Sequence, residues 1–463
     1  MATYQLGVLG LGVMGTSLAK NFIGRGFAAA LYSKDEGERD RFQCETGSYH
    51  VFQNIEEFVN SLEKPRKVIM MITAGRPVDM VLEQLKGYLE PGDIVIDGGN
   101  SYYKDTNRRT EYYRSLGLHF VGMGVSGGEL GALTGPSMMV GGDETAWKAC
   151  GGMLKTAAAL ADGESCCNYV GRDGAGHYVK MVHNGIEYAV MELIAESYYF
   201  MKEGMGLSTD KIAGVFKSWK HTELNSYLID ITVTVLEKPD EDGTPLVERI
   251  RGVARQKGTG LWTMLESLER GAYIPTIYQA VAMRQFSEHR VVKAERVCGP
   301  AGTAASDQDV IDALREALYT SIICCYAQGL NLIKAASDEF GWDINLAASA
   351  SLWKGGCIIR AKLLKEIVEV FETEPELDNL LFAPSMEPVW KQSENLRKIA
   401  LLSMEKKICM PAFTASMTYM DACRMGDMPL NLVQGLRDCF GAHTYERTDR
   451  EGIFHTVWEE IKE

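Results

Sequence analysis

One segment of this 463-residue chain carries side chains whose types and spacing suit acid–base chemistry. Lys180, His183, Asn184, Glu187 and Tyr188 stand at positions i, i+3, i+4, i+7 and i+8, which share one face of an α-helix. A buried amine with a depressed pKa can take the proton of a hydroxyl group, and a carboxylic acid on the same face can protonate carbon. Spacing alone also fits a solvated polar face, but His and Asn are poor helix formers and odd choices for solubility. We therefore take this helix as the candidate catalytic element.

A glycine-rich turn near the N-terminus predicts a dinucleotide-binding site. It lies between a strand pattern and a helix expected over residues 16–25, and consists of Gly10, Leu11, Gly12, Val13, Met14 and Gly15. In this fingerprint the first glycine permits a tight turn, the second lets the backbone approach a pyrophosphate, and the third lets the helix pack on the strand. The helix N-terminus then offers free N–H groups to the anion.

The residues after the second expected strand bear on which dinucleotide binds. An NAD enzyme usually carries an acid there that binds the ribose hydroxyls. This chain has Ser33, Lys34 and Asp35 instead. Ser33 offers no repulsion and Lys34 could meet a 2′-phosphate, whereas Asp35 would oppose that phosphate if it pointed inward. The pattern favours NADP and leaves NAD use open.

The elements that must position these groups change in kind along the chain. Short β-type runs alternate with helical patterns in the first third, which is typical of a parallel sheet with helices on its faces; the runs are 4–9, 28–32, 68–72, 94–97, 119–121, 138–140 and 168–170. Beyond them, helical spacing dominates, most clearly over 307–338. We expect an α/β Rossmann-type domain over 1–175, a large all-α domain over 176–425 and a C-terminal tail over 426–463.

Two further glycine-rich loops follow expected strands. Gly124 to Gly128 matches G-x-S-x-G around Ser126, a pattern found at hydrolase nucleophiles. The better interpretation is a ligand-binding loop at the carboxyl end of a strand, where open α/β sheets bind their ligands. Asn100 lies in a second such loop.

The net charge of the chain restricts the class of ligand that it can bind. With 48 Lys and Arg against 62 Asp and Glu, the net charge of −14 makes nonspecific nucleic-acid binding a poor hypothesis. An anionic ligand would need a local basic cluster, and the candidates are Lys257 with Thr259, Arg284, and Arg437 with His443.

The amino-acid composition and the absence of certain motifs argue against several other classes of protein. The balance of 46% hydrophobic and 24% charged residues is that of an ordinary globular protein. We see no secretory leader, no apolar run of membrane-spanning length and no metal-ligand motif. The 11 cysteines are odd in number and fit reduced thiols, so we expect a cytoplasmic protein without a metal.

Five segments resemble the 6-phosphogluconate dehydrogenase family, and the resemblance runs from the Gly10 turn to the tail. The segments are 96–101, 124–129, 180–188, 256–260 and 440–446. The resemblance implies decarboxylating oxidation of 6-phosphogluconate by NADP⁺ to ribulose 5-phosphate, in a homodimer whose tail enters the partner's site. Lys180 would be the base for the C3 hydroxyl, and Glu187 the acid that protonates C1 of the enediol.

The resemblance also implies how the ligands are held. The sugar acid would contact Asn100, Ser126, Gly127, Gly128, His183 and Asn184. Its phosphate would lie near Tyr188, Lys257, Thr259 and Arg284, with Arg437 and His443 from the partner's tail. The coenzyme would contact the 10–15 turn, Ser33, Lys34, Asp35, Ile72, Thr73, Ala74 and Asn100.

The chain departs from the family pattern in three places. Gly12 replaces the usual Ala, Ser33 to Asp35 replaces Asn-Arg-Thr, and residues 273–279 before Arg284 differ. Lys34 lacks the planar group with which Arg stacks on adenine. The alternatives are a β-hydroxyacid dehydrogenase acting on an unphosphorylated acid, a Ser126 hydrolase, and a noncatalytic nucleotide-binding protein.

Overall fold

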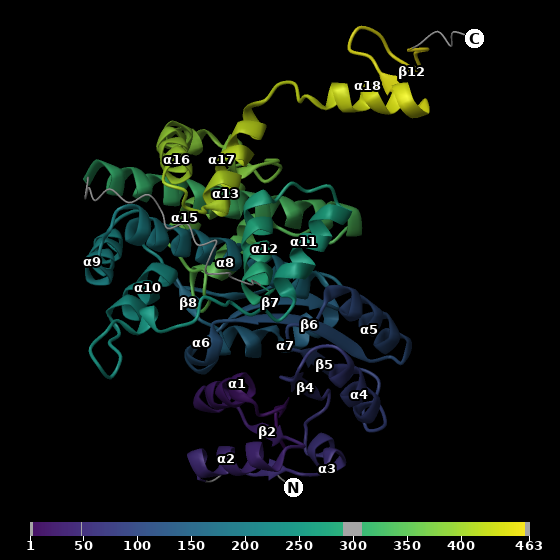
Figure 1. The fold of residues 1–463 in the computed structure, drawn as a ribbon. Coiled ribbons are helices and arrows are strands. Elements are labelled where there is room, and N and C mark those ends of the chain that lie inside the picture. Colours follow the sequence, from purple (N-terminus) through teal and green to yellow (C-terminus); the bar gives the residue numbers. More distant parts are fainter. Residues whose placement is uncertain (1–2, 48, 290–307, 459–463) are drawn as a thin grey trace. The chain divides into compact units, whose positions relative to one another are not determined.

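The N-terminal third forms an eight-stranded sheet (Figure 1). The computed structural model describes residues 3–47, 49–289 and 308–458. In spatial order the sheet reads β10 (Cys167–Gly171), β7 (Ser137–Gly142), β6 (His119–Ser126), β5 (Ile94–Asp97), β4 (Lys67–Met70), β1 (Leu6–Leu9), β2 (Ala29–Tyr32) and β3 (Val51–Phe52). Neighbouring strands are parallel except β6 and β7, so β7 and β10 run against the rest.

Helices cover both faces of this sheet because its strands are apolar on both sides. On one face Phe22 of α1 (Val13–Gly24) and Leu154 of α7 (Glu144–Ala157) belong to one buried apolar cluster. On the other face, Phe58 and Leu82 join a second cluster, from α3 (Ile55–Asn60) and α4 (Arg76–Leu85) respectively. The remaining helices of this region are α2 (Glu36–Thr46), α5 (Tyr103–Ser115) and α6 (Gly128–Thr134), and a small hairpin adds β8 (Leu160–Ala161) and β9 (Glu164–Ser165).

The doubly wound arrangement places a crevice next to the glycine turn. Strands β1 and β4 are neighbours, and the chain leaves their carboxyl ends toward helices on opposite faces. Such a switch point is where open α/β sheets bind ligands.

The next region is helical, as the sequence predicts. Its first helix, α8 (Ala175–Tyr199), lies against β6 and β7 and contacts α11, α12 and α13. The other helices are α9 (Thr209–Trp219), α10 (Tyr227–Glu237), α11 (Thr259–Glu269), α12 (Pro275–His289), α13 (Gln308–Phe340), α14 (Leu346–Ser351), α15 (Leu363–Thr373), α16 (Glu387–Glu405) and α17 (Pro411–Arg424). In the described part of the chain, no helix combines the length and the apolarity needed to cross a bilayer.

Contacts divide the chain into a unit of residues 1–417 and a second unit of residues 418–463. Taken by itself, the second unit holds helix α18 (Leu430–Gly441) and a hairpin of β11 (Tyr445–Glu446) and β12 (Ile453–Phe454). Its buried carboxylate, Asp438, accepts hydrogen bonds from Thr444 N, Thr456 N, His455 Nδ1 and Trp458 Nε1 at 2.8–3.0 Å. A shared carboxylate therefore organises the chain after α18.

The expected strands all appear; β5 has the expected ends, and the ends of the others are shifted. The two-residue β3 was not expected, because so short a run carries no pattern. The antiparallel pairing of β7 with β6 was not expected either, since strand direction is set by the connection and not by the strand's own residues. The long helix expected over 307–338 is α13, whose described part begins at Gln308. The expected domain limits at 175 and 425 stay predictions.

Candidate active site

The polar face of α8 forms a continuous chain of contacts. Lys180 Nζ donates to Asn184 Oδ1 at 2.7 Å and lies 3.4 Å from His183 Nδ1. The same ring nitrogen is 3.9 Å from Glu187 Oε2. His183 therefore stands between the amine and the carboxyl, and the structure brings Lys180 and Glu187 to one side of their helix.

Burial shifts the pKa values of these groups toward their neutral forms. Lys180 is 6% exposed, and loss of water lowers the pKa of its amine, against the opposing charge of Glu187. Burial raises the pKa of the Glu187 carboxyl, although Lys180 and Arg284 oppose the rise. The pKa of His183 falls well below its usual value through burial and the charge of Lys180. A neutral amine and a protonated carboxyl are the states needed for a base and an acid.

Glycines in strands β6 and β7 let α8 pack closely against the sheet. This close packing brings the polar face of α8 to the end of β6. A Cβ at Gly124 would lie 2.2 Å from Lys180 Cβ, and one at Gly141 would lie 2.3 Å from the backbone nitrogen of Gly176. Ser126, which ends β6, is buried, and its Oγ lies 3.3 Å from His183 Nε2. Gly127 and Gly128 follow in turn conformations and begin α6, so this loop borders the polar face of α8.

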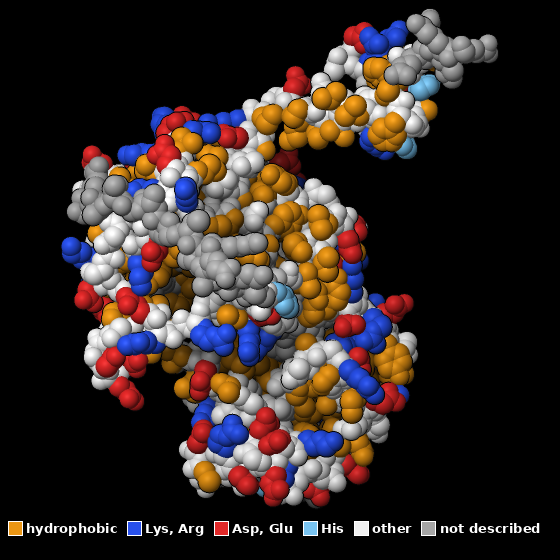
Figure 2. Space-filling view, viewed as in Figure 1, with side chains coloured by type: hydrophobic (Ala, Val, Ile, Leu, Met, Phe, Trp, Pro, Cys, Tyr) orange, Lys and Arg blue, Asp and Glu red, His pale blue; other side chains and the backbone are white. Residues whose placement is uncertain are grey.

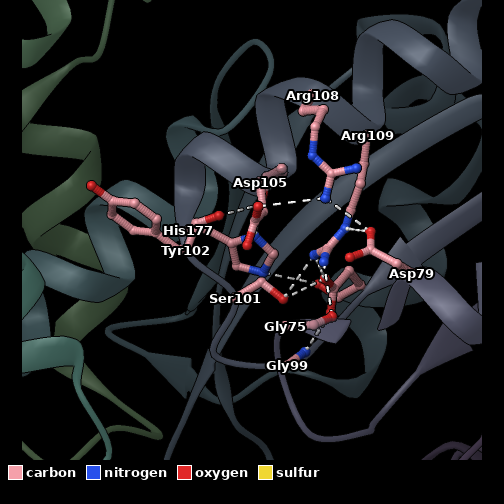
Figure 3. Close-up of polar contacts among 11 residues, drawn as sticks. Gly75, Asp79, Gly99, Ser101, Tyr102, Asp105, Arg108, Arg109 and His177 are labelled. Atoms are coloured by element: carbon pink, nitrogen blue, oxygen red, sulfur yellow. Dashed lines mark hydrogen bonds and ion pairs between the residues drawn. The ribbon is translucent and has the colours of Figure 1, made fainter. Parts of the chain in front are cut away.

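The loop that carries Asn100 is fixed by a buried ion network that the sequence did not reveal (Figure 3). Asp97 accepts from Gly99 N at 3.0 Å and from Ser101 Oγ at 2.6 Å, which braces the loop on both sides of the exposed Asn100. Arg109 Nη1 lies 3.6 Å from Asp97 Oδ2, and Arg109 Nη2 donates to Gly75 O at 3.0 Å. One buried guanidinium thus connects the Asn100 loop with the loop after β4.

The loop after β4 holds the predicted coenzyme residues Ile72, Thr73 and Ala74, of which Thr73 is exposed. A Cβ at Gly10 would meet Ile72 Cγ2 at 2.7 Å, so this loop and the glycine turn are in contact. The two loops border the crevice between β1 and β4.

A second buried carboxylate ties the Asn100 loop to the helical region. Glu266 of α11 is fully buried and accepts from Tyr102 OH at 2.5 Å and from Tyr103 OH at 2.6 Å. The Tyr102 ring stacks on Trp262, with centroids 4.9 Å apart. These contacts bring the start of α11, where Thr259 lies, toward the Asn100 loop.

Tyr188, in the middle of α8, is the point at which the predicted phosphate residues of the first unit make contact. The Tyr188 ring packs against Gly260, where a Cβ would lie 2.7 Å from Tyr188 Cε2. The guanidinium of Arg284 lies over the same ring, 3.4 Å from its centroid. Thr259 is buried next to Gly260, while Lys257 is exposed in the loop before α11.

The glycine turn has the geometry of a pyrophosphate cradle. Gly10 has φ +93°, and a Cβ at Gly15 would lie 1.9 Å from Gly10 O, so neither position tolerates a side chain. No side chain caps α1 at Gly12, which leaves the N–H groups at its start, including those of Val13 and Met14, for an anion. These residues fit a dinucleotide.

The residues after β2 form the adenosine end of the crevice. Asp35 caps α2 by accepting from Glu38 N at 2.8 Å, so its carboxylate is engaged with its own helix. Lys34 is exposed, and Ser33 Oγ donates to Glu38 Oε2 at 2.6 Å. Sequence reasoning missed Glu38; its place in the first turn of the helix after β2 was the available signal.

Arg437 and His443 belong to the second unit. Arg437 Nη1 donates to Gln434 Oε1 at 2.9 Å, and the His443 ring packs edge-on against Phe440. Within the described ranges, no group of His, Cys, Asp and Glu is arranged to hold a metal.

A dinucleotide crevice together with a buried amine and a partly buried carboxyl defines the class as a nicotinamide-dependent dehydrogenase. Family comparison is more specific. Residues 5–171 match the NAD binding domain of 6-phosphogluconate dehydrogenase, and residues 176–458 match the 6-phosphogluconate dehydrogenase C-terminal domain. The chain belongs to the 6-phosphogluconate dehydrogenase family.

Individual relatives agree along the whole chain. A Bacillus subtilis protein named NADP(+)-dependent, decarboxylating 6-phosphogluconate dehydrogenase is 46% identical, covering 99% of this chain and 100% of the relative. A Synechocystis protein named decarboxylating 6-phosphogluconate dehydrogenase is 47% identical, covering 99% and 98%. The Plasmodium falciparum 6-phosphogluconate dehydrogenase, solved in apo form, with NADP⁺ and with 6-phosphogluconate, superposes with a TM-score of 0.94 at 40% identity, covering 98% of this chain and all of that one.

Proposed function

We propose that this chain catalyses the oxidative decarboxylation of 6-phosphogluconate to ribulose 5-phosphate and CO₂ with NADP⁺. The observation that carries the proposal is the pairing of a buried amine and a partly buried carboxyl through His183, on a helix packed against the carboxyl end of β6. Family membership favours this activity over a Ser126 hydrolase, an unphosphorylated hydroxyacid substrate and a noncatalytic protein.

Lys180 and Glu187 act as base and acid in sequence. Neutral Lys180 takes the proton of the C3 hydroxyl, and bound NADP⁺ supplies the acceptor for the C3 hydride. The protonated Lys180 then returns its proton to the C3 ketone oxygen, which takes up the electron pair released as CO₂ leaves, and the enediol results. Protonated Glu187 delivers its proton to C1 of that enediol while Lys180 takes the proton of the adjacent C2 hydroxyl, and ribulose 5-phosphate results.

The remaining residues hold the substrate. Asn100, Ser126, Gly127, Gly128, His183 and Asn184 bind the sugar acid. Tyr188, Lys257, Thr259 and Arg284 bind its phosphate, and the stacking of Arg284 on Tyr188 supports this role. The phosphate site of each subunit is completed by Arg437 and His443 from the tail of the partner subunit.

Tail exchange between two copies is supported by the second unit itself. Helix α18 exposes a row of apolar side chains, visible along it in Figure 2; they are Leu430, Leu432, Val433, Leu436 and Phe440. A helix of a soluble domain buries such a face against a partner. We assign residues 1–175 to coenzyme binding, 176–425 to substrate binding and dimerisation and 426–463 to the exchanged tail, and we place the enzyme in the cytoplasm.

A mixed-dimer experiment tests the tail assignment. Subunits carrying Lys180→Met and subunits carrying Arg437→Ala are each expected to be inactive as homodimers. A mixed dimer regains activity, because one of its sites combines an intact Lys180 with an intact partner tail. Absence of recovery in isolated mixed dimers would contradict tail exchange.

The activity test compares 6-phosphogluconate with gluconate, its unphosphorylated counterpart. Formation of NADPH, CO₂ and ribulose 5-phosphate is expected from the phosphorylated acid. Loss of the phosphate contacts is expected to lower kcat/KM for gluconate by about a hundredfold or more. Equal kcat/KM for the two acids would refute the substrate assignment.

A further inference from the structure

The carboxylate of Glu38 lies at the adenosine end of the coenzyme crevice. The sequence left open whether NAD or NADP binds there. Glu38 Oε2 accepts hydrogen bonds from Ser33 Oγ at 2.6 Å and from Leu11 N at 3.1 Å. Its other oxygen lies 3.5 Å from where a Cβ on Gly12 would stand. Glu38 therefore bridges the end of β2 and the glycine turn.

This position is where coenzymes with and without a 2′-phosphate are distinguished. In Rossmann-type sites an acid at the end of the second strand accepts hydrogen bonds from the adenosine ribose hydroxyls, whereas a cation there accommodates a 2′-phosphate. In this chain the strand-end residue is Ser33, and its hydroxyl is engaged by Glu38. The acid comes from the first turn of α2 and reaches the same place.

The nearby cations do not neutralise this carboxylate. Arg39 Nη1 donates to the carbonyl oxygens of Ser33 and Lys34, at 3.1 and 3.0 Å. The Lys34 side chain is exposed. Within the described ranges, the ion pairs of the structure include no partner for Glu38.

We propose that Glu38 is the residue that sets coenzyme specificity, and that it makes this enzyme accept NAD⁺ as readily as NADP⁺. Its free lone pairs accept hydrogen bonds from the 2′- and 3′-hydroxyls of NAD⁺. A 2′-phosphate at the same place faces a like charge, and part of the affinity gained from Lys34 or Arg39 is lost. The inference rests on the proposed dehydrogenase function and concerns only its coenzyme subsite.

Kinetics with both coenzymes test the inference. The wild type is expected to show kcat/KM values for NAD⁺ and NADP⁺, at saturating 6-phosphogluconate, that differ by less than about tenfold. Glu38→Gln keeps both acceptor contacts but removes the charge, and is expected to shift the ratio at least about tenfold toward NADP⁺. Glu38→Lys is expected to shift it further.

Glu36→Gln is the matched control, because Glu36 is an exposed acid in the same helical turn and has no contact with the glycine turn. Its coenzyme ratio should equal that of the wild type. A wild-type preference for NADP⁺ above about a hundredfold, or a Glu38→Gln ratio within about threefold of wild type, would overturn the inference.

Binding of coenzyme fragments separates this inference from the function itself. Calorimetry on the full chain compares 5′-AMP with 2′,5′-ADP, and no substrate is needed. The wild type is expected to bind 5′-AMP at least as tightly, and Glu38→Gln to favour 2′,5′-ADP. If 6-phosphogluconate were not turned over, the fragment preference would still decide the role of Glu38.

Discussion

The side-chain oxygen of Asn184 accepts a hydrogen bond from Lys180 Nζ at 2.7 Å, one helical turn away. An amide orients the amine without supplying a full negative charge, so the cationic form gains less than it would from a carboxylate. Burial then lowers the pKa of Lys180. The chain thereby holds an amine in place and keeps it available as a base.

Replacing Lys180 with Met is expected to abolish oxidation. Removal of a general base costs about 10²-fold to 10⁴-fold in rate, or more. Coenzyme binding should stay close to normal, because Lys180 lies on α8 and not in the glycine turn. Lys180→Arg is the control for charge, since a guanidinium cannot be deprotonated and should be equally inactive. Near-normal turnover in either variant would count against the base assignment.

The same substitution is expected to stabilise the fold at neutral pH. The folded pKa of Lys180 lies below the ordinary 10.5, so folding disfavours the protonated form. The penalty is complete below the folded pKa, where both states are protonated. It fades as pH rises toward 10.5, because there the unfolded chain binds the extra proton. Urea denaturation should show Lys180→Met gaining most near neutral pH and less as pH rises; a constant difference would contradict this.

Glu187→Gln is expected to block formation of ribulose 5-phosphate. Glutamine keeps the shape of the side chain but cannot donate the proton to C1. In the wild type, burial raises the pKa of Glu187 above 4.5, so the acid stays protonated at higher pH than usual. The rate of the protonation step should fall as pH rises through that raised pKa. Unchanged ribulose 5-phosphate formation in the variant would remove Glu187 from the mechanism.

Arg109→Met is expected to destabilise the protein and misplace Asn100. Arg109 is 2% exposed, and its loss leaves the fully buried Asp97 without its cation, which costs about 3–5 kcal/mol of unfolding free energy. The neighbouring Arg108, 58% exposed, pairs with Asp79 and Asp105 and gives a matched control. Arg108→Met should cost less than about 1 kcal/mol. Denaturant unfolding measures the free energy of unfolding of both variants. Equal decreases in the two variants would contradict a special role for Arg109.

Asp438→Asn is expected to disorder the second unit while leaving the first unit folded. Burial alone would raise the pKa of Asp438, but hydrogen bonds from His455, Thr456, Trp458 and Thr444 outweigh it and hold the pKa far below 3.8. The stabilisation is therefore present above 3.8 and is lost as pH falls through the lowered value.

Hydrogen exchange at Thr444 and Thr456 measures this effect directly, because both backbone amides donate to Asp438. Asp449→Asn is the control, since Asp449 forms only an exposed pair with Arg447. Protection retained in Asp438→Asn would show that other contacts fold the tail.

The sequence alone predicted the layout and most of the chemistry. Helical periodicity placed Lys180 and Glu187 on one face, because two turns of α-helix bring positions i and i+7 to the same side. The Gly10 turn predicted the coenzyme crevice because strand–turn–helix context restricts what such glycines can do. These are local relationships, and local sequence specifies them.

Tertiary structure decided the relationships between distant segments. The contact of Ser126 with His183, the joining of Asp97 and Gly75 by Arg109, and the position of Glu38 over the glycine turn link residues 12 to 57 positions apart. No periodicity marks such pairs, since strand order and helix packing bring them together. Burial is decided at the same level, and it is burial that lowers the pKa of the Lys180 amine and raises the pKa of the Glu187 carboxyl, as the proposed base and acid require.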